Sequence, residues 1–231
     1  RLFLSNLSRV WLFLIEPCKK LSIPGSFFVG EKEDPMRSPI KVVLAGPPRS
    51  GKSCLRQGLK DAVRSIPGAP YPYVITACPD GEGAWFQETV NLSPELAAQA
   101  KAAYKSKFTP EFVSRVADSV EKCALPLVLV DIGGITSAEN RQICRTATHA
   151  ILLAGDVGRL PEWRAFCEEL GISVLAEIPS DYHGTSDTEP VLGSDGAYHG
   201  SVHHLERGES IKERPTVRAL AEILIRLATG Q

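Results

Sequence analysis

One short pattern constrains the fold of this chain more than any other. The apolar run Ile40–Ala45 leads directly into Gly46-Pro-Pro-Arg-Ser-Gly51-Lys52-Ser53, and a helical pattern begins at Lys52. Two glycines at this spacing, followed by Lys and then Ser or Thr, fit a loop whose backbone N–H groups surround a phosphate. The pattern requires a buried strand before it and a helix after it, and the sequence has both. It therefore predicts a phosphate-binding loop (P-loop) on an α/β fold.

Each fixed residue of this loop has a physical role. Gly46 and Gly51 allow tight turns and leave space for phosphate oxygens. Lys52 brings an ammonium group to the β- and γ-phosphates, Ser53 offers a hydroxyl ligand to Mg²⁺, and the helix N-terminus adds partial positive charge. The predicted nucleotide-binding residues are Gly46, Pro47, Pro48, Arg49, Ser50, Gly51, Lys52, Ser53 and Cys54.

A second acidic position completes such a site. The apolar run Leu127–Val130 ends at Asp131, which we expect to hold Mg²⁺, through a water molecule, because Mg²⁺ keeps much of its hydration shell. Ser53 and Asp131 are thus the predicted metal-binding residues, and Lys52 and Asp131 the first catalytic candidates. A glycine of the following Ile132-Gly-Gly segment is placed to approach the γ-phosphate with its N–H group. The alternative is that Asp131 caps a helix.

A further acidic segment, Ala77-Cys-Pro-Asp80-Gly-Glu82-Gly, follows the second apolar run. Two carboxylates between glycine and proline hinges are able to reach Mg²⁺ or to orient a water molecule. Asp80 and Glu82 are therefore additional catalytic candidates. The alternative is a polar turn whose acids are solvated.

Apolar runs without alternation are typical of strands covered on both faces. They predict strands over Ile40–Ala45, Tyr73–Ala77, Leu127–Val130, Ala150–Ala154 and Ser173–Ile178. Helical patterns predict helices over Lys52–Ser65, Ser93–Tyr104, Pro110–Cys123, Ala138–Ala147, Pro161–Leu170 and Pro215–Leu227. The alternation predicts a three-layer α/β sandwich with a mainly parallel sheet. The stretch Asp181–Gly208 is poor in apolar residues and is expected to be a long loop, where a metal site of His199, His203 and His204 is the minority interpretation.

The two ends of the sequence differ in character. Residues 1–35 show no helical or strand period and end in the charged stretch Gly30–Pro35, directly before the single methionine, Met36. We expect an unstructured extension or upstream translation over 1–35 and a nucleotide-binding domain over 36–231. The alternative is that 1–35 docks onto another chain.

Composition excludes some classes of function. The chain has 231 residues, a net charge of −1 and a pI of about 6.6, which give no bulk attraction to nucleic acid or to anionic membrane. The 6 cysteines include no C-x-x-C pair, so most are expected to be buried thiols in a reducing compartment, and the location is expected to be cytoplasmic.

The residue after Asp131 bears on mechanism. ATPases of the AAA and RecA kinds usually carry a glutamate there as a base, whereas this chain has Ile132. D-x-G-G resembles instead the division of P-loop NTPases that contains small kinases, dethiobiotin-synthetase-like enzymes and GTPases. Because no N-K-x-D pattern for guanine follows a strand, ATP with Mg²⁺ is the expected ligand.

Several blocks together resemble one family. They are G-P-P-x-S-G-K-S, A-C-P-D-G-E-G-x-W, T-P-E-F-V, D-x-G-G, T-H-A-I-L-L and E-W-R-A-F-C, spread between Ile40 and about Leu227. The combination resembles the AAA-like P-loop domain fused to, or encoded beside, CRISPR-associated ring nucleases that degrade cyclic oligoadenylate. The resemblance implies nucleotide binding by the P-loop and a ring nuclease domain or subunit as a partner. It does not imply nuclease activity in this chain, because the nuclease is a separate domain.

Three functions follow as hypotheses. The first is a slow Mg-ATPase acting as a nucleotide-dependent switch or assembly module, with a homo-oligomer as one form of assembly. The second is a small-molecule kinase or dethiobiotin-synthetase-like enzyme, which would use the 80–83 and 181–208 segments to hold an acceptor. The third is a nucleotide-gated binding subunit without turnover.

Overall fold

A computed structural model describes residues 38–78 and 108–230 of the chain. Strands and helices alternate along most of it, and a pair of adjacent strands precedes the last helix. The strands are β1 (Ile40–Ala45), β2 (Pro72–Thr76), β3 (Leu127–Asp131), β4 (His149–Ala154), β5 (Ser173–Asp181), β6 (Thr188–Leu192) and β7 (Tyr198–His203). The helices are α2 (Lys52–Ser65), α5 (Pro110–Lys122), α6 (Ala138–Cys144), the short 3₁₀ helix η2 (Val157–Arg159), α7 (Leu160–Glu169) and α8 (Pro215–Thr229).

The strands of the described residues form a 7-stranded sheet in the order β2-β3-β1-β4-β5-β7-β6. All neighbouring strands are parallel except β6, which runs antiparallel to β7 at the edge. Strand β3 lies directly beside β1, with Leu44 opposite Asp131 at their carboxyl ends. The acidic position and the loop that follows β1 therefore meet at one edge of the sheet, as the predicted division of P-loop NTPases requires.

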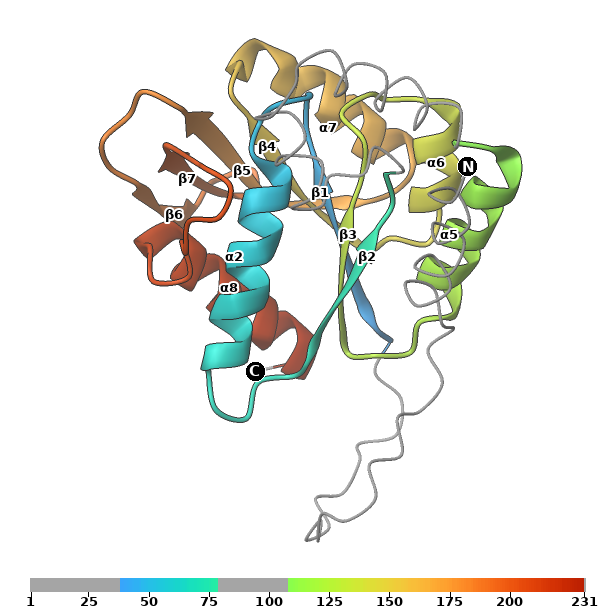
Figure 1. Cartoon of the computed structure of the whole chain (residues 1–231), viewed down its shortest axis with the longest axis horizontal. Helices are drawn as coiled ribbons and strands as arrows, with labels where there is room; N and C mark the ends of the chain where they lie inside the picture. The colour runs from blue at the N-terminus through green and yellow to red at the C-terminus, as the bar shows by residue number, and fades with distance from the viewer. Residues whose placement is uncertain (1–37, 79–107, 231) are drawn as a thin grey trace, which may run out of the picture.

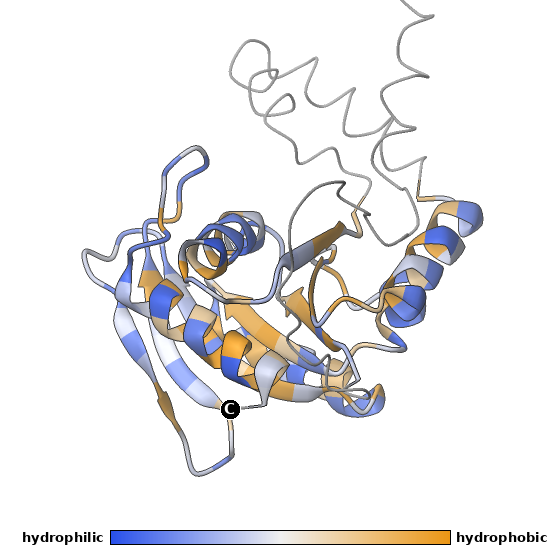
Figure 2. Ribbon diagram, turned by 90° about the horizontal axis from the view of Figure 1, so that it is seen from below, coloured by the Kyte–Doolittle hydropathy of each residue, from blue (hydrophilic) through white to orange (hydrophobic). Residues whose placement is uncertain are grey.

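Helices cover both faces of the sheet and make the predicted three-layer sandwich (Figure 1). On one face α2 and α8 pack against a cluster that includes Leu55, Leu59 and Leu220. On the other face α5, α6 and α7 enclose a second cluster, centred on Trp163 and Phe166. Figure 2 shows the central strands in orange between helices with blue outer surfaces, as expected when each helix buries one apolar stripe.

Local signals account for the helix boundaries. Helix α5 begins where the Thr109 side chain accepts a hydrogen bond from the N–H of Phe112, and Pro110 occupies its first position. Helix α8 also begins with proline, at Pro215, and ends at Gly230, whose φ of 75° stops the helix. The predicted helix over 93–104 lies outside the described residues.

The stretch 181–208 is not a long loop, so that prediction was wrong. It contains β6 and β7, which extend the sheet beyond β5. Few apolar residues were needed, because β7 buries only one face against α8, where Val202 is buried, and backbone pairing with β5 supplies the rest. The Thr216 hydroxyl of α8 also lies 2.9 Å from the carbonyl oxygen of Thr188 and 2.7 Å from that of Ser201, which ties the edge to the helix.

The histidines of this stretch do not converge on a metal. His199 faces Asp195, with Nε2 2.9 Å from a carboxylate oxygen, and His203 pairs through Nδ1 with Asp187. Within the described ranges, no group of three or more His, Cys, Asp or Glu side chains is arranged to hold a metal ion. These two histidines are each held by a carboxylate of their own.

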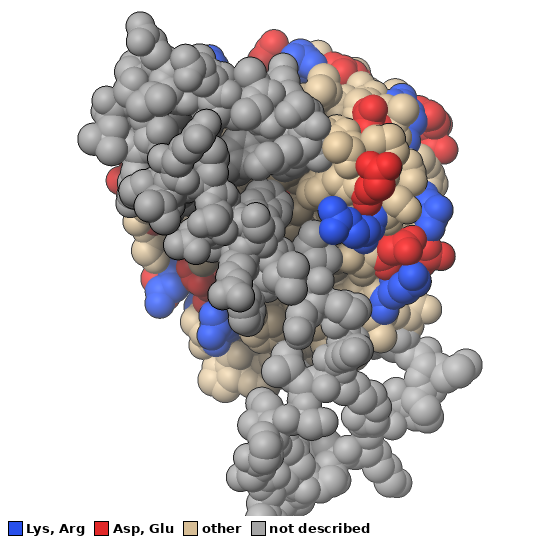
Figure 3. Space-filling model, turned by 45° about the vertical axis from the view of Figure 1, so that its right-hand side comes forward, with Lys and Arg blue, Asp and Glu red and all other residues tan. Residues whose placement is uncertain are grey.

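Charges are balanced over the visible surface. Figure 3 shows acidic and basic side chains interspersed on the described part of one face. Ion pairs such as Arg141 Nε to Glu169, at 2.9 Å, link neighbouring helices. None of the helices in 38–78 and 108–230 is long and apolar enough to span a membrane.

The cysteines differ in accessibility, which gives a first prediction. Burial raises the pKa of the Cys144 thiol to about 12 and that of Cys167 to about 11, and Cys123 is also buried. Because the thiolate is the reactive form, iodoacetamide at pH 8 should alkylate the half-buried Cys54 and Cys78 before the three buried thiols of the described residues. Peptide mapping by mass spectrometry measures this, and the unfolded protein provides the control in which all sites react. Fast alkylation of Cys144 in the native protein would contradict the packing described here.

Candidate functional site

The loop after β1 lies close against the neighbouring strand β4, and this approach is possible because residue 46, a glycine, has no side chain. Gly46 has a φ of 141°, and a Cβ added there would lie 1.9 Å from the carbonyl oxygen of Leu153 in β4. Gly51, with a φ of 86°, faces the side chain of Leu205, which a Cβ would approach to 2.6 Å. Both glycine positions of the motif therefore need glycine for steric reasons as well as conformational ones.

Lys52 is buried and folds back over this loop. Its ammonium Nζ donates hydrogen bonds to the carbonyl oxygens of Gly46, at 2.9 Å, and Pro47, at 2.8 Å. These bonds satisfy a buried charge and hold the start of the loop close to the start of α2. The ammonium group thus lies beside the loop backbone whose N–H groups the motif predicts to bind phosphate.

Ser53 and Asp131 come together although 78 positions separate them in the sequence. The Ser53 hydroxyl donates to Oδ2 of Asp131 over 3.0 Å, and Asp131 is buried at the carboxyl end of β3. The next helix, α6, has Ser137 as its N-cap, so the alternative that Asp131 is a helix cap was wrong. A hydroxyl and a carboxylate at this distance are oxygen donors of the kind that Mg²⁺ takes, and the residues therefore fit the predicted metal.

Arg56 belongs to the same cluster and was missed in the sequence. Its Nη1 lies 3.4 Å from Oδ2 of Asp131 and donates to the hydroxyl of Thr76, at 3.2 Å. The signal was present, because Arg56 comes three positions after Ser53 and so shares its face of α2. The buried carboxylate is therefore held by a hydroxyl and a guanidinium at once.

The segment after Asp131 packs against the phosphate loop. A Cβ at Gly134 would lie 2.4 Å from the backbone nitrogen of Pro48, so only glycine allows this approach. Asn140, also missed in the sequence, fixes the segment: its buried Nδ2 donates to the carbonyl oxygens of Gly133, at 3.1 Å, and Ile135, at 2.7 Å. The segment after Asp131 and the phosphate loop are thus in close backbone contact.

Ile132 stands where other ATPases carry a glutamate base. Its side chain is 2% exposed and belongs to the core on the α5–α7 face. It cannot reach a water molecule in the site, and its role is packing. The other acidic candidates, Asp80 and Glu82, lie outside the described residues.

A hollow of about 470 Å³ opens beside the phosphate loop, on the side away from Asp131. It is bordered by the loop itself and by the segments that follow β4, β5 and β7, with Arg49, Ser50, Val157, Asp181, Tyr182 and Leu205 among its lining residues. Crevices at the carboxyl ends of parallel strands are where ligands of open α/β sheets bind. The stretch predicted as a long loop thus contributes several of the residues that line this hollow.

Tyr182 gives the hollow an aromatic wall. Its ring lies 4.9 Å from that of His204, and its hydroxyl donates to Oε1 of Glu206 over 2.7 Å. The hydrogen bond to Glu206 raises the pKa of Tyr182, so the side chain stays a neutral phenol. A flat, neutral surface with 53% exposure is available here for an aromatic ligand group.

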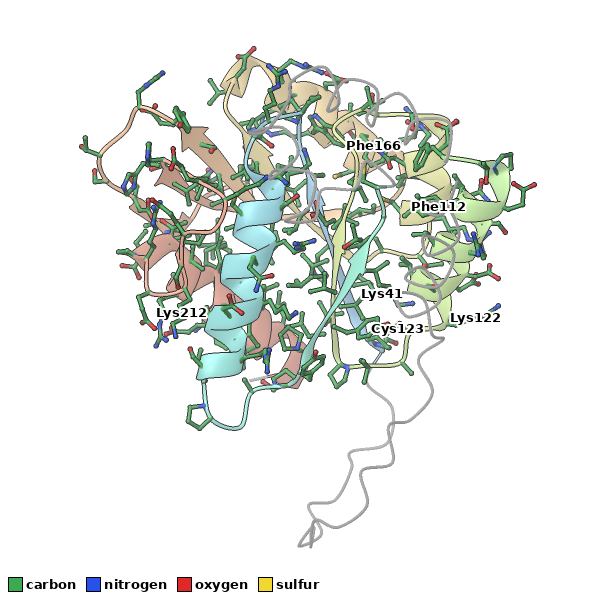
Figure 4. The ribbon with its side chains drawn as sticks, viewed as in Figure 1. Lys41, Phe112, Lys122, Cys123, Phe166 and Lys212 are labelled. Carbon is green, nitrogen blue, oxygen red and sulfur yellow. The ribbon has the colours of Figure 1, made fainter. Side chains whose placement is uncertain are left out.

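A separate charged residue lies at the amino ends of the strands, opposite the candidate site, and is not part of that site. Lys41, at the amino end of β1, lies beside Cys123 (Figure 4), and its Nζ donates to the carbonyl oxygen of Glu121 over 2.7 Å. Burial lowers the pKa of Lys41. Its position at the far end of β1 from the loop excludes it from phosphate contact.

No protein-family model matches the chain, and no curated protein sequence matches it. A protein from Borrelia burgdorferi B31, described as a plasmid partition protein and bound to AMPPNP, is similar with 10% identity and a TM-score of 0.47 over 64% of this chain and 78% of its own. A nucleotide-binding protein from Archaeoglobus fulgidus in complex with ADP is similar with 10% identity and a TM-score of 0.43 over 83% of this chain and 88% of its own.

These similarities are too distant to transfer a ligand, and the phosphate site stands on its own geometry. Neither description mentions a ring nuclease. The resemblance to the family associated with ring nucleases therefore stays a prediction from the sequence.

Proposed function

We propose that this chain binds ATP with Mg²⁺ and hydrolyses it slowly, as a nucleotide-dependent switch or assembly module. The observation that carries the proposal is the meeting of Ser53 and Asp131, 3.0 Å apart, directly beside the phosphate loop and Lys52. Residues from β1, α2 and β3 supply a phosphate site and two metal-binding oxygens at one point. If the loop motif had arisen by chance, there would be no reason for Ser53 and Asp131 to meet beside it.

The chain's own groups have distinct tasks in this proposal. The loop N–H groups and Lys52 bind the phosphate oxygens, and Lys52 leaves the carbonyl oxygens of Gly46 and Pro47 to do so. Ser53 and Asp131 would hold Mg²⁺, which when bound neutralises charge on the β- and γ-phosphates. The hollow bordered by Tyr182 would take the ribose and base, because it continues from the loop away from the metal side.

Slow turnover follows from the position after Asp131. Since the Ile132 side chain packs in the core, the site lacks a base at the position where motor ATPases have one. Asp80 and Glu82 remain the candidates for orienting water. A switch suits this arrangement, because the backbone contact between Gly134 and Pro48 would transmit the presence of the terminal phosphate to the segment after β3.

Lys52→Ala tests the proposal. The variant should bind ATP at least about 100-fold more weakly than the unsubstituted chain, because a buried ammonium group that contacts phosphate is lost. Isothermal titration calorimetry with ATP and Mg²⁺ measures the affinity. Lys60→Ala is the matched control, since Lys60 lies further along the same helix. Equal ATP affinity in the Lys52→Ala variant and in the control would refute the proposal.

The same proteins test the switch. Light scattering with ATP or ADP present, alone and with a ring nuclease subunit, should show a change of assembly that depends on the nucleotide and is lost in the Lys52→Ala variant. The sequence resemblance motivates the choice of partner, and a cytoplasmic location goes with it. ATP binding without any change in assembly would leave a nucleotide-binding protein and remove the switch.

A further inference from the structure

Arg56 lies beside Asp131 as a counter-ion and not as a tightly bonded partner. Its Nη1 lies 3.4 Å from Oδ2 of Asp131, beyond the roughly 2.7–3.2 Å that N–H···O hydrogen bonds span. The same nitrogen donates to the hydroxyl of Thr76 over 3.2 Å, and the buried Nε has no hydrogen-bond partner among the described residues. By contrast, Arg164 donates to both oxygens of Glu177. Charge is therefore the main attraction between Arg56 and Asp131.

The carboxylate oxygen that faces Arg56 also belongs to the predicted metal site. Ser53 donates to this Oδ2 atom over 3.0 Å, so the hydroxyl and the guanidinium meet at one oxygen. The side chains of Arg56 and Asp131 are 18% and 6% exposed, and charges so little screened by water interact more strongly than charges at the surface. The chain itself thus supplies positive charge at the oxygen where Mg²⁺ would supply it.

The charges at this point determine when a divalent cation is attracted to it. Asp131 carries one negative charge, whereas Arg56 and Lys52 each carry a positive one, so positive charge is in excess among these three side chains. Such a group does not attract a free divalent cation. The phosphates of a nucleotide reverse the sign, because they bring several negative charges to the same loop. Metal binding is thereby coupled to nucleotide binding.

We propose that Arg56 is the internal counter-ion of Asp131 and that it prevents Mg²⁺ from binding before the nucleotide. The inference rests on the proposed ATP binding and deepens it, since it concerns the order in which the same site takes its two ligands. The guanidinium stabilises the buried carboxylate while the nucleotide is absent, and it repels a metal ion that approaches the same oxygen. Thr76 gives the guanidinium a hydrogen-bond partner that does not depend on Asp131. Arg56 is a positioning residue, because it acts through Asp131.

Metal binding in the absence of nucleotide tests the inference. Arg56→Gln removes the charge and retains a donor for the hydroxyl of Thr76, whereas Arg56→Lys retains the charge. Mn²⁺ is the probe, because electron paramagnetic resonance measures how much of it is free in solution. The Arg56→Gln chain should bind Mn²⁺ roughly 10-fold or more tightly than the unsubstituted and Arg56→Lys chains, because the cation beside Asp131 is lost. Mg²⁺ should displace the bound Mn²⁺.

Two further variants locate the effect. Arg64→Gln removes the same charge from an exposed position of α2, and its Mn²⁺ binding should be as weak as that of the unsubstituted chain. Asp131→Asn, combined with Arg56→Gln, should abolish the Mn²⁺ binding that Arg56→Gln alone gains. Gained binding that survives in this double variant would place the metal elsewhere and overturn the inference.

The unsubstituted chain provides a measurement that does not depend on the folding of any variant. Millimolar Mg²⁺ without nucleotide should leave its apparent Tm unchanged, and a rise would overturn the inference, because metal bound to the folded state alone stabilises it. Equal Mn²⁺ affinities of the folded Arg56→Gln and unsubstituted chains would also overturn it. Failure of the unsubstituted chain to bind ATP would refute the proposed function instead, and the nucleotide-free comparison would still decide the role of Arg56.

Discussion

Replacing Gly46 by alanine is expected to destabilise the protein by roughly 3–5 kcal/mol and to abolish ATP binding, because the new Cβ has no space and the backbone is strained. The Cβ would lie 1.9 Å from the carbonyl oxygen of Leu153, a backbone atom that cannot rotate away. The ends of β1 and β4 would have to separate, and the φ of 141° would have to change. Urea unfolding and calorimetric titration with ATP measure the two losses.

Two other glycines distinguish the effect of the steric clash from the effect of backbone strain. Gly171 has a φ of 66° with open space around it, so Gly171→Ala should cost only the conformational strain, about 1 kcal/mol. A Cβ at Gly155 would make an ordinary contact of 3.5 Å with the carbonyl oxygen of Ser180, so Gly155→Ala should be nearly neutral. A Gly46→Ala protein as stable as these two controls would show that the loop does not pack on β4 as described.

Replacing Arg164 by methionine should destabilise the protein by roughly 2–4 kcal/mol, because it leaves the carboxylate of Glu177 buried without its cation. Both oxygens of Glu177 accept hydrogen bonds from the Arg164 guanidinium, and the Glu177 side chain is 4% exposed. His199 is a second basic side chain near this carboxylate, with its Nδ1 4.0 Å from Oε2 of Glu177. We do not expect a loss of stability at the upper end of the range that is usual for breaking a buried ion pair, because the Arg164 side chain is half exposed and water can partly replace it.

A double-mutant cycle tests whether the loss comes from the pair. Glu177→Gln should cost less than Arg164→Met, because the remaining arginine can turn to solvent. The double variant should be more stable than Arg164→Met alone, since no buried charge is left unpaired. Arg145→Met is the matched control: Arg145 pairs with Glu121 at an exposed position, where removal should change the free energy of unfolding by less than about 1 kcal/mol. Additive effects of Arg164 and Glu177 would contradict the coupling.

Several elements were predictable from local sequence because local physics decides them. Strand β1 and helix α2 have the predicted bounds, since an uninterrupted apolar run, two glycines and an amphipathic helix follow one another without competing signals. The bounds of β3 and α5 differ from the predictions by one residue at the end. Strands β6 and β7, at the edge of the sheet and next to it, were missed because strands with one solvated face need few apolar residues, and Pro190 and Gly200 within them are typical of loops.

The phosphate loop could be predicted from the sequence alone, because its glycines, lysine and serine lie within eight consecutive residues, 46–53, and their roles depend on the local backbone. Only the tertiary structure decided what surrounds that loop. The order of the strands places Asp131 against Ser53, and the helix face brings Arg56 to the same carboxylate. The hollow beside Arg49 depends on how β4, β5 and β7 end. Contacts between distant segments depend on sheet order and packing, which no local pattern records.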